Sequence, residues 1–339
     1  MPEPLEFSPA PESNEPLDAL ALPSAGTMLS PEDERQFSDA VLILRGPEQP
    51  PKRGGLWLVL SLIAFVVSGR GKQAPMEAAL VAGVIFFHEL GHWLGMRLFG
   101  YRDLKIFFIP FFGGAASGKK EGVPQWQQAI VVLLGPLPGI IVGFACVVAN
   151  QDFQQPLLAQ LAWWLMVING FNLLPLVPLD GGRFLNIVIF SRQRVLETLF
   201  LAVTSVGIIA LSVWLQAYLL AALGVFGLLM VPARFRIAGV AAGVRGRWPV
   251  LPSRIADADD SMLLDLYQHC SPLLTGKFKT QAASRANLMR QVYEQANVRP
   301  VGVLASLGLL AVYALGIALC FLAVLWVVVA AAIARRAGN

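Results

Sequence analysis

Long apolar runs recur along this chain, and they constrain its fold more than any other feature. An α-helix needs about 20 predominantly apolar residues to cross the hydrocarbon core of a bilayer. The composition agrees with such crossings, because 56% of the 339 residues are hydrophobic and only 14% are charged. The sequence predicts an all-α polytopic membrane protein with about six to eight transmembrane helices. We place the runs at 55–69, 76–99, 126–149, 157–179, 197–214, 217–232 and 301–334.

The basic residues divide the loops into two sets, which predicts the orientation of the chain. One set holds Arg70 and Lys72; the other holds Lys52, Arg53, five residues from Arg97 to Lys120, three from Arg183 to Arg194 and ten from Arg234 to Arg299. Because Lys and Arg accumulate in cytoplasmic loops, we expect a multi-pass protein of the bacterial inner membrane with a cytoplasmic N-terminus. Arg335 and Arg336 fit less well, and the run at 301–334 is either one long tilted helix or a tight re-entrant pair.

Changes in composition divide the chain into four segments. Residues 1–54 are acidic and rich in proline, and too poor in apolar side chains to form a core, so we expect a disordered cytoplasmic N-terminus. Residues 55–232 are the expected transmembrane core, 233–300 a cytoplasmic helical segment, and 301–339 a C-terminal transmembrane segment. Within 233–300, DADDSMLLDLYQ and Thr280–Gln295 indicate two helices, which either pack on the membrane core or serve in docking or gating.

Two classes of function are disfavoured by composition. A basic stripe with interleaved aromatic side chains, typical of nucleic-acid binding, does not occur, so we expect no nucleic-acid partner. Cys146, Cys270 and Cys320 lie far apart and without C-x-x-C spacing, which indicates neither a disulfide framework nor a thiolate zinc site.

The stretch HELGH, residues 88–92, stands inside the second apolar run. Residues four apart lie on one face of a helix, so His88 and His92 can direct imidazole nitrogens at one point, with Glu89 beside them. This is the HExxH geometry of a zinc site: two imidazoles hold the metal, the metal lowers the pKa of a bound water toward about 7, and the glutamate takes its proton. We therefore expect one zinc ion per chain.

An isolated HExxH can arise by chance, and a buried histidine is more often a hydrogen-bonded core residue than a ligand. Membrane depth favours the functional interpretation, because an ionisable group there costs about 2.5–3.5 kcal/mol on insertion scales. The chain has three histidines. The third, His269, lies in the polar stretch beside Cys270, where we expect a structural or solvated role.

A catalytic zinc normally takes a third protein ligand, and Asp180 is the best candidate. It ends an apolar run within NGFNLLPLVPLDGGRFL, residues 169–185. Pro175 and Pro178 interrupt the helical ladder, and unwound backbone at membrane depth is tolerated only where it lines a protein or water-filled cavity. The alternative is an Asp that ends a helix at the membrane surface and is followed by a glycine turn. A different membrane zinc protease would usually take a glutamate as third ligand, and the later runs offer only Glu197 for that role.

The HELGH motif at 88–92 is followed by NLLPLVPLDG at 172–181. In this order the two motifs resemble those of the site-2 protease family of intramembrane zinc metalloproteases, and the resemblance covers roughly residues 76–185. The resemblance implies that the zinc ligands are His88, His92 and Asp180. It also implies that Glu89 is the catalytic base and that Asn172 is a polar group near the scissile carbonyl or its oxyanion.

Two further stretches surround these motifs. Lys105–Ala116 is too short to span and rich in strand formers around Pro110, so we expect a short re-entrant β-hairpin near the metal, able to pair with an extended substrate; the alternative is a greasy loop. Gly135, Gly139 and Gly143 recur every four residues, a pattern that lets helices approach closely.

The sequence as a whole predicts an intramembrane zinc metalloendopeptidase, with its metal nearer the cytoplasmic face, that cuts within or near a transmembrane segment of a membrane-protein substrate. Its expected partners are that substrate and the lipid bilayer. Two alternatives remain: another membrane-embedded zinc protease that acts on cytoplasmic-face substrates, and a metal-binding membrane scaffold or transporter without catalysis.

Overall fold

The computed structural model describes residues 30–46, 75–109, 113–190, 193–216, 218–279 and 281–337. These residues are mostly helical, with a small two-stranded antiparallel hairpin. Five of their helices are long and apolar enough to cross a membrane: Met76–Leu98, Gln125–Phe153, Arg194–Trp214, Leu220–Arg247 and Val303–Val327. The span expected at 55–69 lies outside the described residues.

The described elements follow one another along the chain. They are α1 (Pro31–Arg45), α3 (Pro75–Leu98), β1 (Arg102–Ile109), β2 (Gly113–Lys119), α4 (Gln125–Leu133), α5 (Pro136–Phe153), α6 (Pro156–Asn172), α7 (Asp180–Leu185) with a π-helical turn (Asn186–Phe190), α8 (Arg194–Leu215), α9 (Tyr218–Arg247), α10 (Asp260–Cys270), α11 (Ala282–Ala296) and α12 (Val303–Ala337). Short 3₁₀ turns lie at Ile255–Asp257, Ser271–Leu273 and Gly276–Lys279.

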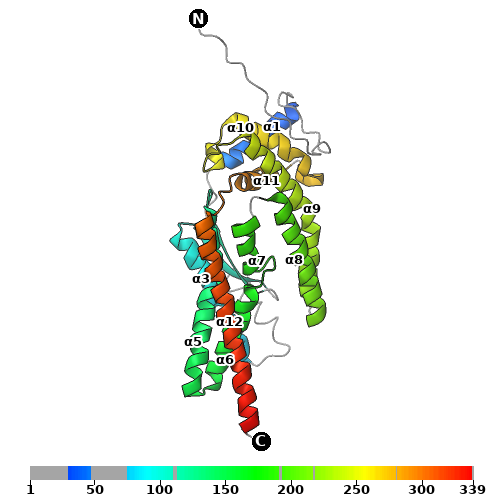
Figure 1. The fold of residues 1–339 in the computed structure, drawn as a ribbon. Helices are drawn as coiled ribbons and strands as arrows, with labels where there is room; N and C mark the ends of the chain where they lie inside the picture. Colours follow the sequence, from blue (N-terminus) through cyan, green and yellow to red (C-terminus); the bar gives the residue numbers. More distant parts are fainter. Residues whose placement is uncertain are drawn as a thin grey trace.

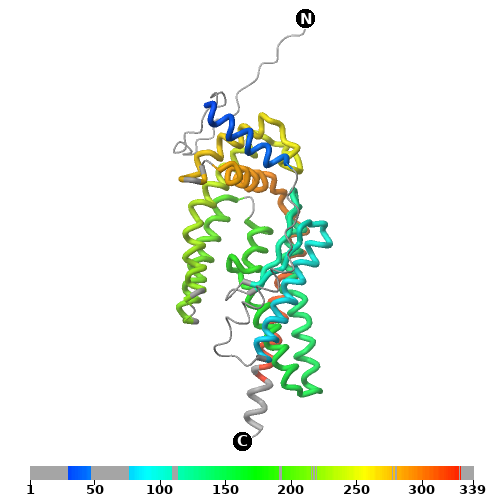
Figure 2. Tube along the Cα trace, turned by 180° about the vertical axis from the view of Figure 1, so that it is seen from behind, coloured from blue at the N-terminus to red at the C-terminus, as the bar shows by residue number. Residues whose placement is uncertain are grey.

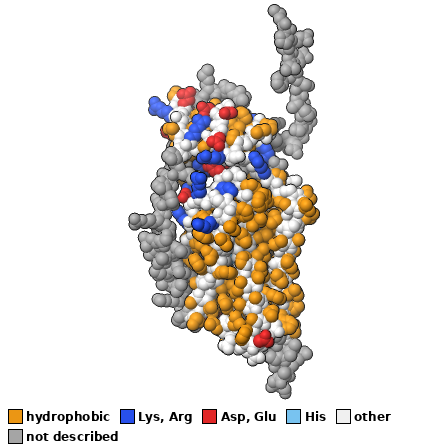
Figure 3. Space-filling view, turned by 90° about the vertical axis from the view of Figure 1, so that its left-hand side faces the viewer, with side chains coloured by type: hydrophobic (Ala, Val, Ile, Leu, Met, Phe, Trp, Pro, Cys, Tyr) orange, Lys and Arg blue, Asp and Glu red, His pale blue; other side chains and the backbone are white. Residues whose placement is uncertain are grey.

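The helices form an elongated molecule with three parts (Figure 1). Helices α3, α5, α6 and α12 make one bundle, and α8 and α9 make an antiparallel pair beside it. A helical domain, made of α1, α10, α11 and the C-terminal part of α9, covers one end of both. The side chains on the surface follow the same division, because hydrophobic ones cover the bundle while charged ones gather at the helical domain (Figure 3).

The boundaries of the bundle helices follow from local sequence. Pro136 begins α5 and supplies no backbone N–H, which separates α4 from α5 inside one apolar run. Gln154 and Gln216 end α5 and α8 in the left-handed conformation, with φ of 48° and 53°. Helix α6 ends at Asn172, so the run expected to span 157–179 stops being helical where Pro175 and Pro178 would interrupt its hydrogen bonds.

The hairpin agrees with the expectation for Lys105–Ala116 and is slightly longer than that stretch. Phe107 faces Ala115 and Phe108 faces Gly114, and an irregularity lies between Arg102 and Lys105. Both strands contact α3, so the hairpin is held against the helix that carries HELGH. Residues 110–112, at its tip, lie outside the described part of the chain.

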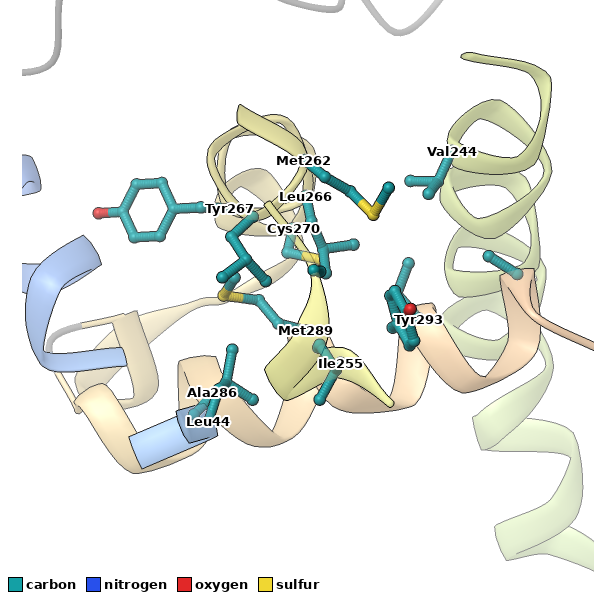
Figure 4. Close-up of a cluster of buried hydrophobic side chains, with 14 of the residues drawn as sticks. Leu44, Val244, Ile255, Met262, Leu266, Tyr267, Cys270, Ala286, Met289 and Tyr293 are labelled. Atoms are coloured by element: carbon teal, nitrogen blue, oxygen red, sulfur yellow. The ribbon is translucent and has the colours of Figure 1, made fainter. Parts of the chain in front are cut away.

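The helical domain has a hydrophobic core of its own (Figure 4). Helix α10 contributes Leu266 and Tyr267, α11 contributes Met289, and α9 contributes Val244, all at most 1% exposed. Buried Arg285 also ties the domain together, since its guanidinium donates to the Ser271 hydroxyl at 2.7 Å. The two helices expected within 233–300 are therefore present as α10 and α11, and they share a core with α1 and the end of α9.

Helix α1 departs from the disorder expected for residues 1–54. Ser30 caps its N-terminus by accepting from the Asp33 N–H at 3.1 Å, and Pro31 stands at the first turn. Seen from behind, α1 lies across α11 (Figure 2), and its Ala40 and Leu44 are buried in the domain core. Three of the acidic residues that suggested disorder, Glu32, Asp33 and Glu34, lie in the first turn of α1, where negative charge favours a helix.

Two other helices differ from expectation in length. Helix α9 continues to Arg247 instead of ending near residue 232, so a single helix joins the apolar pair to the helical domain. The C-terminal run is one helix, Val303–Ala337, which settles the choice between a single span and a re-entrant pair.

Candidate metal centre

Three buried side chains from two helices converge on one point. The distance between the Nε2 atoms of His88 and His92 is 3.1 Å. Asp180 Oδ2 lies 3.0 Å from His88 Nε2 and 3.1 Å from His92 Nε2. Ligands placed 2.0–2.1 Å from a tetrahedral zinc ion are separated by about 3.3 Å. Two imidazoles and a carboxylate at this spacing therefore fit a zinc ion.

The other nitrogen of each imidazole is held by a group of the protein. His88 Nδ1 lies 2.9 Å from Asn169 Oδ1, and His92 Nδ1 lies 2.9 Å from the Val131 carbonyl oxygen. Since both partners are acceptors, each Nδ1 carries the proton and donates it. The Nε2 atoms keep their lone pairs for a metal, the arrangement usual for histidine ligands.

Asn169 is a site residue that the sequence analysis missed. It is 0% exposed, and its Nδ2 donates to the Leu165 carbonyl at 2.7 Å, which fixes the amide with its oxygen toward His88. The only signal in the sequence is a polar side chain one helical turn before Asn172. That spacing does not reveal which residue it faces, because the contact is made between α6 and α3.

The glycines of the GPLPGIIVG stretch pack directly on these side chains. A Cβ atom at Gly135 would overlap the His92 ring, and one at Gly139 would overlap the Asn169 amide. The predicted close approach of helices is therefore present, and it brings backbone against the metal donors and their support.

Glu89 projects beside the three donors and is not one of them. It is 6% exposed and makes a hydrogen bond with the Ala116 backbone of β2. A Cβ atom at Gly114 would lie 2.5 Å from Glu89 Cγ, so β2 is in close contact with this side chain. The Glu89 carboxylate thus lies next to the donor group, and contacts with strand β2 fix its position.

Asp180 reaches the histidines because the chain unwinds after α6. Residues 173–179 form irregular turns, and α7 begins at Asp180 itself. The carboxylate is 5% exposed, and its Oδ1 lies 3.5 Å from Arg183 Nη1. The interruption expected from Pro175 and Pro178 is therefore the feature that delivers Asp180.

Asn172 and Glu197 lie in different surroundings. Asn172 is half-buried in the wall of the cavity described below, and its Nδ2 donates to the Ile168 carbonyl at 3.0 Å. Glu197, the substitute third ligand, accepts from Gln295 Nε2 at 3.3 Å at the boundary with the helical domain. Among the described residues, the group with metal-ligand spacing consists of His88, His92 and Asp180.

A cavity of about 560 Å³ opens on the donors. Its walls come from α3, β2, α4, the end of α6, the turn before α7, α7 itself, and α9, which contributes Leu223. The residues of β2 in the wall are Gly114, Ala115 and Ala116, so this strand borders the donor group. Among the described residues, β2 pairs with β1 alone.

A model of peptidase family M50 matches residues 76–155. This stretch of the chain is therefore similar to that family. Similarity to curated relatives agrees. Zinc metalloprotease MJ0392 of Methanocaldococcus jannaschii is 29% identical over 148 residues, which are 42% of each chain. Stage IV sporulation protein FB of Bacillus subtilis is 30% identical over 140 residues, 41% of this chain and 46% of that protein.

The chain spans less than half the length of these relatives. A solved structure, the site-2 protease from Methanocaldococcus jannaschii, is 21% identical and covers 53% of this chain and 88% of that chain, with a TM-score of 0.38. The family match confirms the resemblance over residues 76–155, which contain HELGH, and together with the five apolar helices it supports a membrane protein. The match includes His88 and His92 and ends before Asp180.

Proposed function

We propose that this protein is an intramembrane zinc metalloendopeptidase that hydrolyses a peptide bond within or near a transmembrane segment of a membrane-protein substrate. One observation carries the proposal: two imidazoles and a carboxylate converge, buried, beside a glutamate on a helix of membrane-spanning length. The match to peptidase family M50 and the zinc metalloproteases among the relatives of the chain support it.

Each site residue has a role in this proposal. His88, His92 and Asp180 hold the zinc ion, which when bound lowers the pKa of a water molecule toward about 7 and polarises a carbonyl. Glu89 is the catalytic base: its carboxylate takes the proton from the attacking water and delivers it to the leaving amide nitrogen. Asn172, in the cavity wall, orients the scissile carbonyl with its amide group.

The free edge of β2 is the proposed site for the substrate backbone. A peptide carbonyl in a transmembrane helix is already hydrogen-bonded, so the substrate must unwind before it reacts, and its released N–H and C=O groups then need partners. Gly114, Ala115 and Ala116 line the cavity, and Gly114 lies against Glu89. In this proposal their backbone offers the strand edge. An extended segment that pairs there recovers backbone hydrogen bonds as an added strand.

The decisive experiment compares the wild-type protein with Glu89→Gln on a reporter membrane substrate, with bound zinc measured in both. We expect Glu89→Gln to keep its zinc, because Gln has the shape of Glu and lies outside the donor group, and to lose cleavage by about 10²–10⁴-fold. The control is Glu77→Gln, in the first turn of the same helix, which should cleave normally.

Two outcomes would oppose the proposal. Cleavage retained by Glu89→Gln would refute the assigned mechanism. Zinc bound by both proteins without cleavage of any membrane substrate would favour the metal-binding scaffold. A protease that acts on cytoplasmic-face substrates is less well supported, because such enzymes usually take a glutamate as third ligand and Glu197 is engaged with Gln295.

The proposal includes an orientation in the bacterial inner membrane. Helices α1, α10 and α11 pack together, so residues 31–45 and 260–296 share one side. We propose that this side is the cytoplasm, because the basic loops lie at the same end. Single cysteines at the exposed positions Glu32 and Val250 should both resist a membrane-impermeant thiol reagent in intact cells. Labelling of either cysteine would show that this end of the protein lies outside the cytoplasm, which would contradict the proposed orientation.

A further inference from the structure

Tyr313 of α12 touches both segments that flank the turn before Asp180. Its hydroxyl donates a hydrogen bond to the Leu173 carbonyl at 2.6 Å, at the point where α6 ends. Its ring stacks on Phe184 in α7, with centroids 4.9 Å apart and 26° between the ring planes. One side chain therefore holds the chain just before and just after residues 174–179, the turn that brings Asp180 to the histidines.

The Leu173 carbonyl supports the first residues of α7. The last carbonyls of a helix have no N–H partner within that helix, and an unpaired carbonyl in an apolar interior is costly. Tyr313 supplies that partner. The same oxygen lies against Gly181, where a Cβ atom would overlap it. A displacement of the Leu173 carbonyl would therefore also move Gly181, the residue that follows Asp180.

Tyr313 is itself fixed by the packing of α12 on the bundle. Gly316, one turn later, approaches the Leu173 and Leu137 side chains, and Cys320 Sγ lies 3.5 Å from the Met166 carbonyl oxygen. Such small residues let two helices approach closely. Tyr313 is 7% exposed and Phe184 is 0% exposed, so neither ring is free to turn away.

We propose that Tyr313 is a positioning residue for the metal centre, holding the Leu173 carbonyl and the Phe184 ring so that Asp180 stays between His88 and His92. It touches none of the metal donors and acts through Asp180, so the inference rests on the proposed function. Helix α12 lies outside residues 76–155, the part that matches the family, and this gives the C-terminal span a task in the site.

The test removes only the hydroxyl. Tyr313→Phe keeps the ring stacked on Phe184 and leaves the Leu173 carbonyl without its donor. We expect the full-length protein in detergent to bind zinc about tenfold more weakly in a chelator competition, as for other groups that orient metal ligands. Tyr218→Phe, at a position on α9 that is 85% exposed, is the matched control and should bind as wild type. Wild-type affinity in Tyr313→Phe would overturn the inference.

A double mutant separates positioning from general stability. Asp180→Ala already weakens zinc binding by removing a ligand, so Tyr313→Phe should add no further loss in that background. A full tenfold additional loss there would show that Tyr313 does not act through Asp180. If zinc-free Tyr313→Phe does not fold, Phe184→Leu takes its place, because it weakens the ring contact and keeps the hydroxyl, with the same expectation in both backgrounds.

The two proposals fail in different ways. A wild-type protein that binds no zinc, or a Glu89→Gln protein that still cleaves, refutes the proposed function. Normal zinc binding and cleavage in the wild type, together with equal affinity in Tyr313→Phe, refutes only the role of Tyr313.

Discussion

Asn169 holds the His88 ring on the side opposite the metal donors. Its amide oxygen accepts from His88 Nδ1, and its amide nitrogen is occupied by the Leu165 carbonyl, so the amide cannot reverse without losing both bonds. Asn172, one turn later on α6, instead bonds within its own helix and faces the cavity. Two asparagines of one helix thus have different surroundings, and we propose that Asn169 serves the histidine and Asn172 the substrate.

Replacing each asparagine by alanine should separate zinc binding from turnover. Asn169→Ala removes the acceptor of the His88 proton, and we expect a 10- to 100-fold lower zinc affinity by chelator competition. Asn172→Ala leaves all three donors supported, so zinc affinity should stay at the wild-type value while kcat falls. The same zinc affinity in both variants, or a reversed order, would contradict this division.

At the scale of single residues, the sequence predicts those site residues whose positions follow from local helix geometry. His88 and His92 lie on one face by their spacing alone, and Asp180 follows from the prolines that unwind the chain before it. Asn169 and Tyr313 could not be predicted, because each meets its partner across a helix-helix contact. The angle and register of such contacts depend on all the side chains packed between the helices. A local sequence pattern therefore does not predict them.

Strand β2 is the element that joins the proposed substrate edge to Glu89. Gly114 is the point of contact, because a Cβ atom there would meet Glu89 Cγ at 2.5 Å and Ile85 Cγ2 at 2.9 Å. The hairpin itself was predictable from its short length and strand-forming residues. Its contact with Glu89 was not, because the paired glycines at 113 and 114 indicate a turn as readily as a close approach.

Gly114→Ala should reduce cleavage without removing zinc. The added methyl group pushes Glu89 or the strand aside, and a displacement of about 1 Å can cost about 100-fold in rate. The control is Gly83→Ala on α3, where a Cβ atom would meet nothing within 4 Å. Single-turnover cleavage and bound zinc are the measurements. Full activity in Gly114→Ala would show that β2 does not set the position of Glu89.

In the proposed reaction the substrate must also change its secondary structure, from helix to extended strand. Gly and Pro lower the stability of a helix interior by about 1 and 3 kcal/mol, so introducing either near a mapped cleavage site should speed cleavage severalfold. An Ala substitution at the same substrate position is the control. A slower or unchanged rate with Gly and Pro would contradict the requirement for unwinding.

Helix α1 shows where composition misleads about an element. Its acidic residues and Pro31 were read as signs of disorder, yet they are the residues that favour a helix N-terminus. The pattern that predicts the helix is the apolar series Phe37, Ala40, Val41 and Leu44, which lies on one face and packs into the helical domain. The low content of apolar residues over the whole segment hid this short series.

For the whole molecule, the helical domain contains a pH-sensitive link between α9 and α10. His269 Nδ1 lies 3.2 Å from Asp265 Oδ1, and Asp265 Oδ2 accepts from Trp248 Nε1 at 3.0 Å. The hydrogen bond with Asp265 raises the pKa of His269 above its usual 6.5 against the opposing effect of burial. Burial opposes ionisation of Asp265, but hydrogen bonds from His269, Trp248 and Arg247, together with the positive charge of Arg247, outweigh it and lower the pKa of this carboxyl group.

The stability of the helical domain should therefore decrease as the pH rises from 6 to 8. The folded form keeps a proton on His269 at pH values where the unfolded chain has released it, so this contribution is complete below about 6.5 and is lost above the folded pKa. His269→Gln should be less stable than wild type at pH 6, and the difference should shrink by pH 8. Thermal unfolding in detergent measures this; a constant difference across the range would contradict it.

Helix α9 connects this domain to the metal-site cavity as one rod. Leu223 lines the cavity, and Val244 lies in the domain core. At 1.5 Å per residue they are about 31 Å apart, so a swing of about 5° at one end moves the other by about 3 Å. Pro232 removes one backbone N–H from the helix between them. A swing of the helical domain is therefore either absorbed by bending of α9 at Pro232 or changes the width of the cavity beside His88 and His92.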